Sequence, residues 1–233
     1  MNKIFIVEDE KAIRDELLTF LTNSGYEAEA LTDFKNAKAE ILAAGADLIL
    51  MDINIPYMNG EVLLSELRRE TDVPVIMVTS KNSEVDEVLS MSYGADDYVT
   101  KPFNPLELTA RVKSQLRRYM QLNPNSKPAG EKHQSEITVR NLTINRDNHK
   151  VTIDGEEIRL TPIEFDILFL LASNPGKVFS TDEIFERVWN EKVYEANNTV
   201  MVHIRRLRGK MKEDTRTDKI ITTVWGVGYK IEK

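Results

Sequence analysis

The sequence predicts an α/β protein of two domains: a doubly wound, five-stranded parallel sheet followed by a smaller α+β domain. Three observations support this prediction. Short apolar runs alternate with helical patterns through residues 1–120, as they do in parallel sheets covered by helices on both faces. The run Leu48–Met51 is apolar without alternation and stops at Asp52, which is typical of a strand buried on both faces. After residue 135 the pattern changes to short alternating segments and three amphipathic helices.

The elements of the first half follow from this periodicity. The expected strands are Lys3–Val7, Glu27–Leu31, Asp47–Met51, Pro74–Val78 and Asp97–Thr100. The expected helices are Ala12–Leu21, Asn36–Ala44, Val62–Arg69, Val85–Tyr93 and a last one that begins at Pro105 with Asn104 as its cap. The right-handed crossover rule leaves few ways to wind such a sheet, and in the flavodoxin-like order the first and third strands are neighbours.

In that strand order, residues from four strand ends would meet on one rim of the sheet. They are Glu8, Asp9, Asp52, Thr79 and Lys101. Three carboxylates in one pocket repel one another unless a cation offsets their charge, and Mg²⁺ prefers carboxylate, water and phosphate oxygens. An ionised Asp52 can then attack phosphorus, with Mg²⁺ and Lys101 stabilising the phosphoryl oxygens and the Thr79 hydroxyl donating a hydrogen bond. Each residue alone has a simpler interpretation as a cap, turn former or surface charge, so the prediction depends on their coincidence.

Composition narrows the class of protein. The formal net charge of −7 is uneven: residues 1–120 hold 13 Lys+Arg and 21 Asp+Glu, and residues 121–233 hold 18 and 17. The absence of cysteine excludes disulfides, thiolate metal sites and cysteine nucleophiles, and fits a reducing compartment. No apolar run approaches the roughly 20 residues that span a bilayer, and the acidic Glu8–Glu10 comes too early for a secretory signal. We therefore expect a cytoplasmic protein outside the membrane.

The motifs of the first half resemble the receiver domains of two-component response regulators. They are Val7–Glu10, Met51–Pro56, Met77–Ser80 and Gly94–Phe103. The resemblance covers residues 1–120. It implies that Asp52 is the phospho-acceptor, that Glu8, Asp9, Asp52 and the Asn54 main-chain carbonyl hold Mg²⁺, and that Lys101 and Thr79 contact the phosphoryl group. It also implies that Tyr98 turns inward when Thr79 moves.

The second half begins after a polar segment, residues 121–135, whose prolines and glycine predict a flexible linker. A small antiparallel sheet is expected from three segments, Thr138–Ile144, Lys150–Ile153 and Glu157–Leu160, with a turn at Asp154-Gly155. Thr161 and Glu164 form the pattern of a capping box before a helix that ends near Gly176. A second helix, Thr181–Trp189, is expected to be capped by its threonine, and a third runs from Asn197 to Met211.

The third helix indicates the partner of the second half. Val200, Ile204, Leu207 and Met211 form one apolar stripe, and Met201, Arg205, Arg208 and Lys212 form a ridge one position further round. Between Asn197 and Met211 lie four cationic residues and no acid. Such a helix can enter a major groove, where arginine reads guanine and other cations neutralise phosphates. A solvated cationic face is the alternative; three helices followed by a hairpin, Ile220–Ile231, favour DNA binding.

This order of sheet, three helices and hairpin resembles the winged helix-turn-helix domains of OmpR/PhoB-type transcription factors over residues 136–233, and the ending is similar to that of VanR-type regulators. By position, Met201, Arg205 and Arg206 would face bases or nearby backbone. Five further residues would lie near phosphates: Trp189, Thr199, His203, Arg208 and Tyr229. Relatives often carry an arginine in the wing where this chain has Trp225.

Receivers of this family dimerise through charge pairs, and the matching residues here are Asp96, Asp97, Glu107, Arg111 and Arg118. Position 87 departs from the pattern, because Glu87 would face Glu107 instead of supplying a lysine. Exposed pairs contribute only about 0–1 kcal/mol each, so this change weakens or re-routes the interface without excluding it.

The sequence therefore predicts a phosphorylation-activated, DNA-binding transcription regulator of a two-component system. Its expected partners are a sensor histidine kinase, a second copy of the chain upon phosphorylation, direct-repeat double-stranded DNA and, as a further candidate, RNA polymerase. One alternative is a constitutive DNA-binding regulator whose receiver is a vestigial dimerisation domain. Another is a metal-dependent phosphohydrolase, which would leave the basic helix unexplained.

Overall fold

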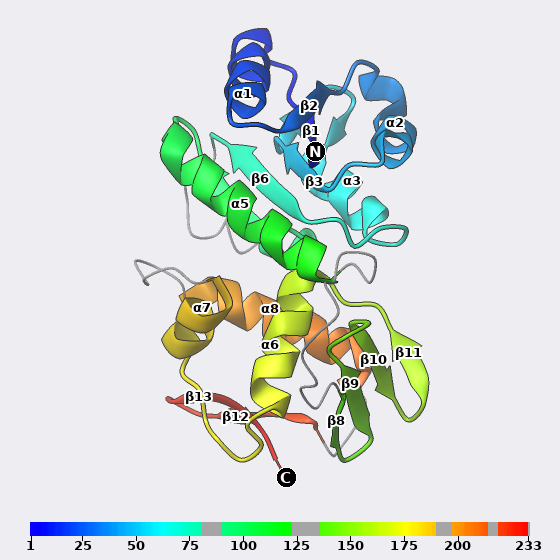
Figure 1. Cartoon of the computed structure of the whole chain (residues 1–233), viewed down its shortest axis with the longest axis vertical. Helices are drawn as coiled ribbons and strands as arrows, with labels where there is room; N and C mark the ends of the chain where they lie inside the picture. Colours follow the sequence, from blue (N-terminus) through cyan, green and yellow to red (C-terminus); the bar gives the residue numbers. More distant parts are fainter. Residues whose placement is uncertain (81–89, 123–135, 190–196, 214–218, 233) are drawn as a thin grey trace. The chain divides into compact units, whose positions relative to one another are not determined.

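The computed structural model describes residues 1–80, 90–122, 136–189, 197–213 and 219–232. The chain divides into two compact units, Met1–Tyr119 and Met120–Lys233 (Figure 1). Most of the predicted helix Val85–Tyr93, including Glu87, and most of the predicted linker lie outside the described residues. Among the described helices, none is long and apolar enough to cross a membrane.

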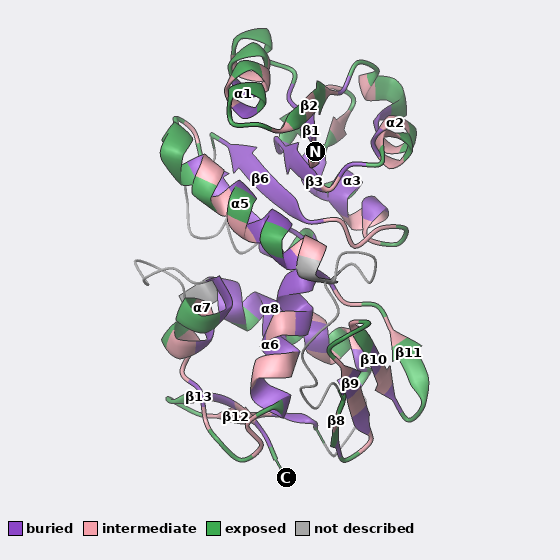
Figure 2. Cartoon of the chain, viewed as in Figure 1, coloured by how far each residue is buried: buried purple, intermediate pink, exposed green. Residues whose placement is uncertain are grey.

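The first unit is built on a five-stranded parallel sheet, as predicted. Its strands are β1 (Lys3–Val7), β2 (Glu27–Ala30), β3 (Leu48–Met51), β6 (Val75–Thr79) and β7 (Asp97–Thr100). Their order is β2-β1-β3-β6-β7, with every neighbouring pair parallel. The central strands β3 and β6 are buried along their whole length (Figure 2), which explains why their sequences do not alternate.

Helices cover both faces of this sheet. They are α1 (Lys11–Asn23), α2 (Ala37–Ala44), α3 (Gly60–Leu67) and α5 (Pro105–Leu122), with a 3-10 turn η1 (Phe34–Asn36) before α2. Leu17 of α1 and Leu108 of α5 pack on one face with Ile4 and Leu48, while α2 and α3 lie over the other face (Figure 1). The Asn104 side chain accepts the Leu106 N–H at 2.9 Å, so the predicted cap of α5 is confirmed.

Two features near the end and the middle of the first unit were not predicted. Helix α5 continues to Leu122, two residues into the segment expected to be linker. A hairpin of two-residue strands, β4 (Asn54–Ile55) and β5 (Met58–Asn59), follows Asp52 and was not predicted. Strands of two residues are too short to show any periodicity, so the sequence pattern carries no signal for them.

The second unit begins with a four-stranded antiparallel sheet. Its strands are β8 (Glu136–Val139), β9 (Leu142–Asn145), β10 (Lys150–Ile153) and β11 (Glu156–Ile158). The single segment predicted over residues 138–144 is therefore wrong: the chain turns at Arg140, whose φ of 57° lies in the left-handed region, and β8 and β9 pair with each other. The turn at Asp154-Gly155 is confirmed by positive φ at both residues.

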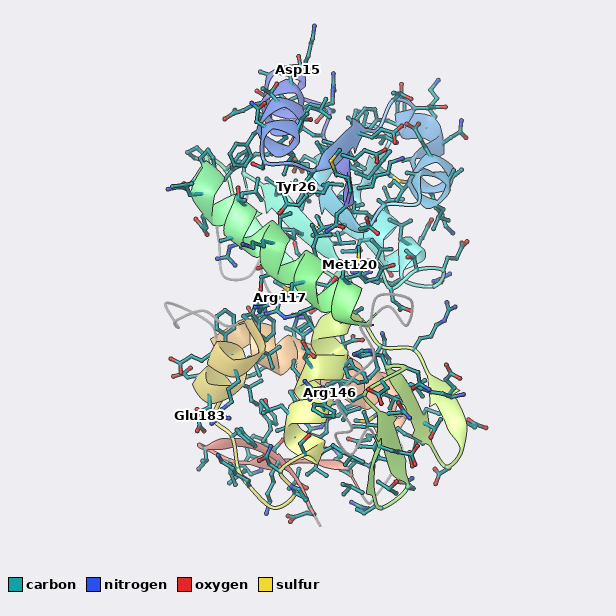
Figure 3. The ribbon with its side chains drawn as sticks, viewed as in Figure 1. Asp15, Tyr26, Arg117, Met120, Arg146 and Glu183 are labelled. Carbon is teal, nitrogen blue, oxygen red and sulfur yellow. The ribbon has the colours of Figure 1, made fainter. Side chains whose placement is uncertain are left out.

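In its described residues the second unit also holds three helices and a hairpin: α6 (Pro162–Ala172), α7 (Thr181–Trp189), α8 (Asn197–Lys210), β12 (Ile221–Val224) and β13 (Gly228–Ile231). The Thr161 N–H donates to the Glu164 carboxylate at 2.8 Å, as the capping box predicts. The cap of α7 is Ser180 and not Thr181: the Ser180 hydroxyl accepts the Glu183 N–H, and the Glu183 carboxylate accepts the Ser180 N–H, each at 3.0 Å. Figure 3 labels Glu183 at this helix start.

The core of the second unit gathers the predicted stripe of α8 with both other helices. Val200, Ile204, Leu207 and Met211 are at most 2% exposed and belong to the same cluster as Leu168 of α6. This packing fixes α8 on the domain by one face.

Candidate functional site

Three acidic residues, Glu8, Asp9 and Asp52, lie close together at the ends of two neighbouring strands of the first unit. Strands β1 and β3 are neighbours that end at Val7 and Met51, and the Asp52 N–H donates to the Val7 carbonyl at 2.9 Å. One carboxylate oxygen from each of Glu8, Asp9 and Asp52 lies within 4.8 Å of the others. Glu8 is 2% and Asp52 6% exposed, whereas Asp9 is exposed. The cluster therefore opens to solvent on the side of Asp9.

Lys101 bridges the two buried carboxylates. Its Nζ lies 2.5 Å from Glu8 Oε2 and 2.6 Å from Asp52 Oδ2. The Lys101 N–H donates to the Thr79 carbonyl at 2.8 Å, so the end of β6 positions the lysine. Burial lowers the pKa of Lys101, but the hydrogen bonds to Asp52 and Glu8 outweigh it and leave the pKa raised. Burial raises the pKa of Glu8 by more than the bond to Lys101 lowers it.

This donor set fits Mg²⁺. One ammonium group contacts two of the three carboxylates, so the pocket keeps an excess of negative charge. A small hard cation takes oxygen ligands of this kind together with water. The predicted fourth ligand, the carbonyl of Asn54, stands two residues after Asp52, and the Asn54 N–H donates to Asp52 Oδ1 at 3.1 Å. That hydrogen bond holds the Asp52 side chain and the Asn54 backbone in one local arrangement.

Thr79 and Tyr98 lie on the neighbouring strands β6 and β7. Thr79 is the last residue of β6 and is fully buried. Tyr98 pairs in register with Met77, two residues before Thr79, and its side chain is only 8% exposed. The tyrosine expected to turn inward is therefore already largely buried in this structure.

The residues predicted to form a dimer interface make bonds within the chain. Asp96 is not a surface residue: it is fully buried, it lies 2.5 Å from Arg68 Nη2, and it accepts the Val75 N–H. Asp96 therefore bonds within the receiver in this structure, and its part in a dimer interface stays a prediction. Arg111 bonds Asp97 at 2.8 Å and Glu107 at 3.0 Å. Arg118 is 4% exposed.

On α8, the predicted outward ridge is only partly present. Met201 is 44% exposed and Arg205 is exposed, as expected, but the Arg208 side chain is 18% exposed. Arg208 donates to the Ile221 carbonyl and to the Thr223 hydroxyl, each at 2.8 Å. It therefore joins α8 to the β12–β13 hairpin and does not point outward.

A carboxylate from outside α8 pairs with two further cationic residues of this helix. Glu164 of α6, fully buried, lies 3.0 Å from Arg206 Nη2 and 2.6 Å from Lys210 Nζ. These contacts hold the pKa of Glu164 down at about 2 although burial acts to raise it. The sequence of α8 itself does not indicate this pairing, because the carboxylate comes from a segment more than 30 residues earlier. The Thr161–Glu164 pattern identified Glu164 only as part of a cap.

The other residues predicted to approach phosphates are buried in this structure. Trp189 is 2% exposed and stacks on Phe185, and Thr199 is 4% exposed. His203 is fully buried, with its ring centroid 5.5 Å from that of Trp189. Tyr229 is 9% exposed beneath the Arg208 guanidinium. As folded here, the His203 ring is not exposed to solvent, and its contact with a phosphate stays a prediction.

Comparisons with known proteins agree for both units. A family model of the response regulator receiver domain matches residues 4–113, and one of the C-terminal domain of transcriptional regulatory proteins matches residues 155–231. The chain is 46% identical over 232 residues to the regulatory protein VanRc of Enterococcus gallinarum, covering 99% of both chains. It is 42% identical over 235 residues to VanR of Enterococcus faecium, covering 100% of this chain and 99% of the relative.

A solved structure extends the likeness to the fold. A mutant of RitR covers 100% of both chains at 27% identity, with a TM-score of 0.76. The chain therefore belongs to the two-component response regulators of the OmpR/PhoB type, which are phosphorylation-dependent, DNA-binding transcription regulators and not enzymes.

Proposed function

We propose that Asp52 accepts a phosphoryl group from a sensor histidine kinase in the cytoplasm and that this event controls DNA binding by α8. The observation that supports it most is the contact of Lys101 Nζ with both Asp52 and Glu8, at 2.6 and 2.5 Å. A cation at this place can balance the charge that a phosphoryl group brings to Asp52. An ionised carboxylate needs no general base to attack phosphorus.

The transfer is a displacement at phosphorus. An Asp52 carboxylate oxygen forms a bond to phosphorus, and the bond from phosphorus to the donor's leaving group breaks. Mg²⁺, held by Glu8, Asp9, Asp52 and the Asn54 carbonyl, would neutralise the approaching phosphoryl oxygens. Lys101 would then exchange its contact with Asp52 for a phosphoryl oxygen. The buried Thr79 hydroxyl would turn to donate to another, with Tyr98 responding on the next strand.

The mass of the intact protein after incubation with acetyl phosphate and Mg²⁺ tests this assignment. We expect the wild type to gain one phosphoryl group, Asp52→Asn to gain none, and removal of Mg²⁺ with a chelator to prevent the gain. Asp15→Asn is the matched control, since Asp15 is an exposed acid on α1 (Figure 3). Equal modification of the wild type and Asp52→Asn would exclude Asp52 as the acceptor.

The proposed DNA contact is the exposed face of α8. Met201 and Arg205 are four residues apart, so they lie on one face of the helix, and both are exposed. An arginine so placed suits the O6 and N7 atoms of guanine. We expect Arg205→Ala to abolish preference for the site recovered from a random DNA pool by the wild type. Unchanged preference would contradict a base-reading role for Arg205.

We also propose that phosphorylation brings two receivers together, so that the two α8 helices of the dimer bind direct-repeat DNA. The DNA-bound dimer would then be available to contact RNA polymerase. Arg111, bonded to Asp97 and Glu107 within one chain, is 20% exposed and can exchange either partner for the same residue of a second copy. Sedimentation with Mg²⁺ and beryllofluoride should show a dimer of the wild type and a monomer of Asp52→Ala. A wild type that stays monomeric would contradict this step.

A further inference from the structure

The guanidinium group of Arg14 bonds the backbone of two of the clustered acidic residues. Arg14 lies near the start of α1, and its Nη1 atom donates to the Glu8 carbonyl and to the Asp9 carbonyl, each at 3.1 Å. One nitrogen atom of a side chain thus serves two consecutive carbonyls. It joins α1 to the connection between β1 and α1, which carries two of the three clustered carboxylates.

The two acidic residues differ in how their positions are fixed. The Glu8 side chain is buried, bonds Lys101 and accepts the Glu10 N–H at 3.2 Å. Asp9 is exposed, and among the residues that the structure describes, Arg14 supplies the one hydrogen bond to Asp9. Strand pairing does not hold Asp9, because β1 ends two residues before it. The position of Asp9 therefore depends on Arg14 more than that of Glu8 does.

Arg14 also closes the first turn of α1. Its backbone N–H donates to the Glu10 carbonyl at 2.9 Å. Glu10 is the N-cap residue, and in the described part of the chain its side chain makes no capping hydrogen bond. Three consecutive carbonyls, those of residues 8, 9 and 10, therefore accept hydrogen bonds from Arg14.

Two physical effects of Arg14 on a bound cation oppose each other. Groups that hold the ligands of a metal without touching the ion commonly change its affinity about 10- to 100-fold, because they fix the ligands in place. A guanidinium also carries a positive charge, which repels a divalent cation bound nearby. Removal of Arg14 should therefore weaken metal binding if position dominates and tighten it if charge dominates.

We propose that Arg14 is a positioning residue for Mg²⁺, which holds the backbone of Glu8 and Asp9 so that their carboxylates can bind the ion, and that this effect exceeds the repulsion by its charge. The inference rests on the proposed Mg²⁺ site of the receiver. It assigns a role in metal binding to a side chain of α1 that offers no oxygen ligand.

The affinity of the full chain for Mg²⁺, measured by titration calorimetry with the metal alone, tests the sign of the effect. Arg14→Met should bind Mg²⁺ about tenfold more weakly than the wild type. Arg14→Lys keeps a charged donor on a chain of similar length and should recover most of this loss. Lys11→Met is the matched control, since Lys11 is an exposed cation of the same helix turn, and loss of its charge should not weaken Mg²⁺ binding.

Phosphorylation by acetyl phosphate gives a second readout. The initial rate for Arg14→Met should be below that of the wild type at limiting Mg²⁺ and should reach it at saturating Mg²⁺, because the ligands themselves are unchanged. A merely structural role would instead lower the urea midpoint measured without Mg²⁺ and leave the Mg²⁺ affinity at the wild-type value.

Wild-type or tighter Mg²⁺ binding by Arg14→Met would overturn the inference. A loss that Lys11→Met shows equally, a loss that Arg14→Lys does not reduce, or a rate that stays low at saturating Mg²⁺ would overturn it as well. A wild type that binds no Mg²⁺ would also overturn the proposed metal site, so the two failures are distinguishable.

Discussion

Single charged residues in this protein differ mainly in how far they are buried. Asp96 and Arg68 form a pair whose side chains are 0% and 10% exposed, whereas Lys38 and Glu70 form one that is 36% and 51% exposed. A charge left alone in a buried site costs far more than one left in water. Removing one partner of the buried pair should therefore lower the free energy of unfolding by more than removing one partner of the exposed pair.

Arg68→Ala tests this difference. Without the guanidinium, Asp96 would remain buried beside the start of β6, and we expect the free energy of receiver unfolding to fall by about 3–5 kcal/mol. Lys38→Ala should lower it by at most about 1 kcal/mol. Urea denaturation followed by circular dichroism measures both, and tryptophan fluorescence identifies the transition of the second unit, which holds both tryptophans. Equal losses in the two variants would contradict the argument from burial.

Two glycines differ in how much room they leave for a side chain. A Cβ atom at Gly60 would lie 2.1 Å from the Asp52 carbonyl oxygen, so Gly60→Ala must shift the backbone that carries the proposed phospho-acceptor. We expect a loss of stability of about 1–3 kcal/mol and a lower yield of phosphorylation by acetyl phosphate. A Cβ atom at Gly209 of α8 would have no atom within 4 Å apart from its chain neighbours and the backbone of its own helix, so Gly209→Ala should stabilise the protein by about 0.5–1 kcal/mol. The same sign of change in both variants would contradict this.

Among the elements, α6 and α8 are joined by one carboxylate. Glu164 of α6 bonds the Thr161 N–H, Lys210 and Arg206 while fully buried. Two cations of α8 are thereby held against the domain core, and Arg208 is held by the hairpin. Helix α8 is thus attached to its neighbours by its own cationic residues.

The pH dependence of stability follows from this contact. The pKa of Glu164 falls from 4.5 to about 2 on folding, so its ionised form contributes stability above pH 4.5 that is lost as the pH falls from there towards 2. The loss amounts to about 3 kcal/mol. Tryptophan fluorescence during urea denaturation at several pH values measures it, and Glu164→Gln should remove that part of the dependence. Glu156→Gln, at an exposed acid that faces Lys212, should leave the dependence as in the wild type.

For the whole molecule, local sequence patterns predicted the fold well and the long-range partners poorly. The run Leu48–Met51 and its abrupt end at Asp52 predicted the strand and the site together, because strand order brings the strand ends to one rim. The partners of Asp96 and Arg206 were not predictable in this way. Arg68 and Glu164 lie in other elements, and nothing in the local sequence indicates which surface a charge will face after packing. The capping serine of α7 was missed because the adjacent Thr181 is also a favoured cap by residue type.

We propose that a phosphoryl group on Asp52 controls DNA binding by the second unit. The most direct test is the affinity of the full chain for a selected duplex, in Mg²⁺ with and without beryllofluoride, for the wild type and Asp52→Ala. We predict that beryllofluoride tightens binding by the wild type and has no effect on Asp52→Ala. If the two proteins bind equally in both conditions, the receiver does not control DNA binding and the claim is contradicted.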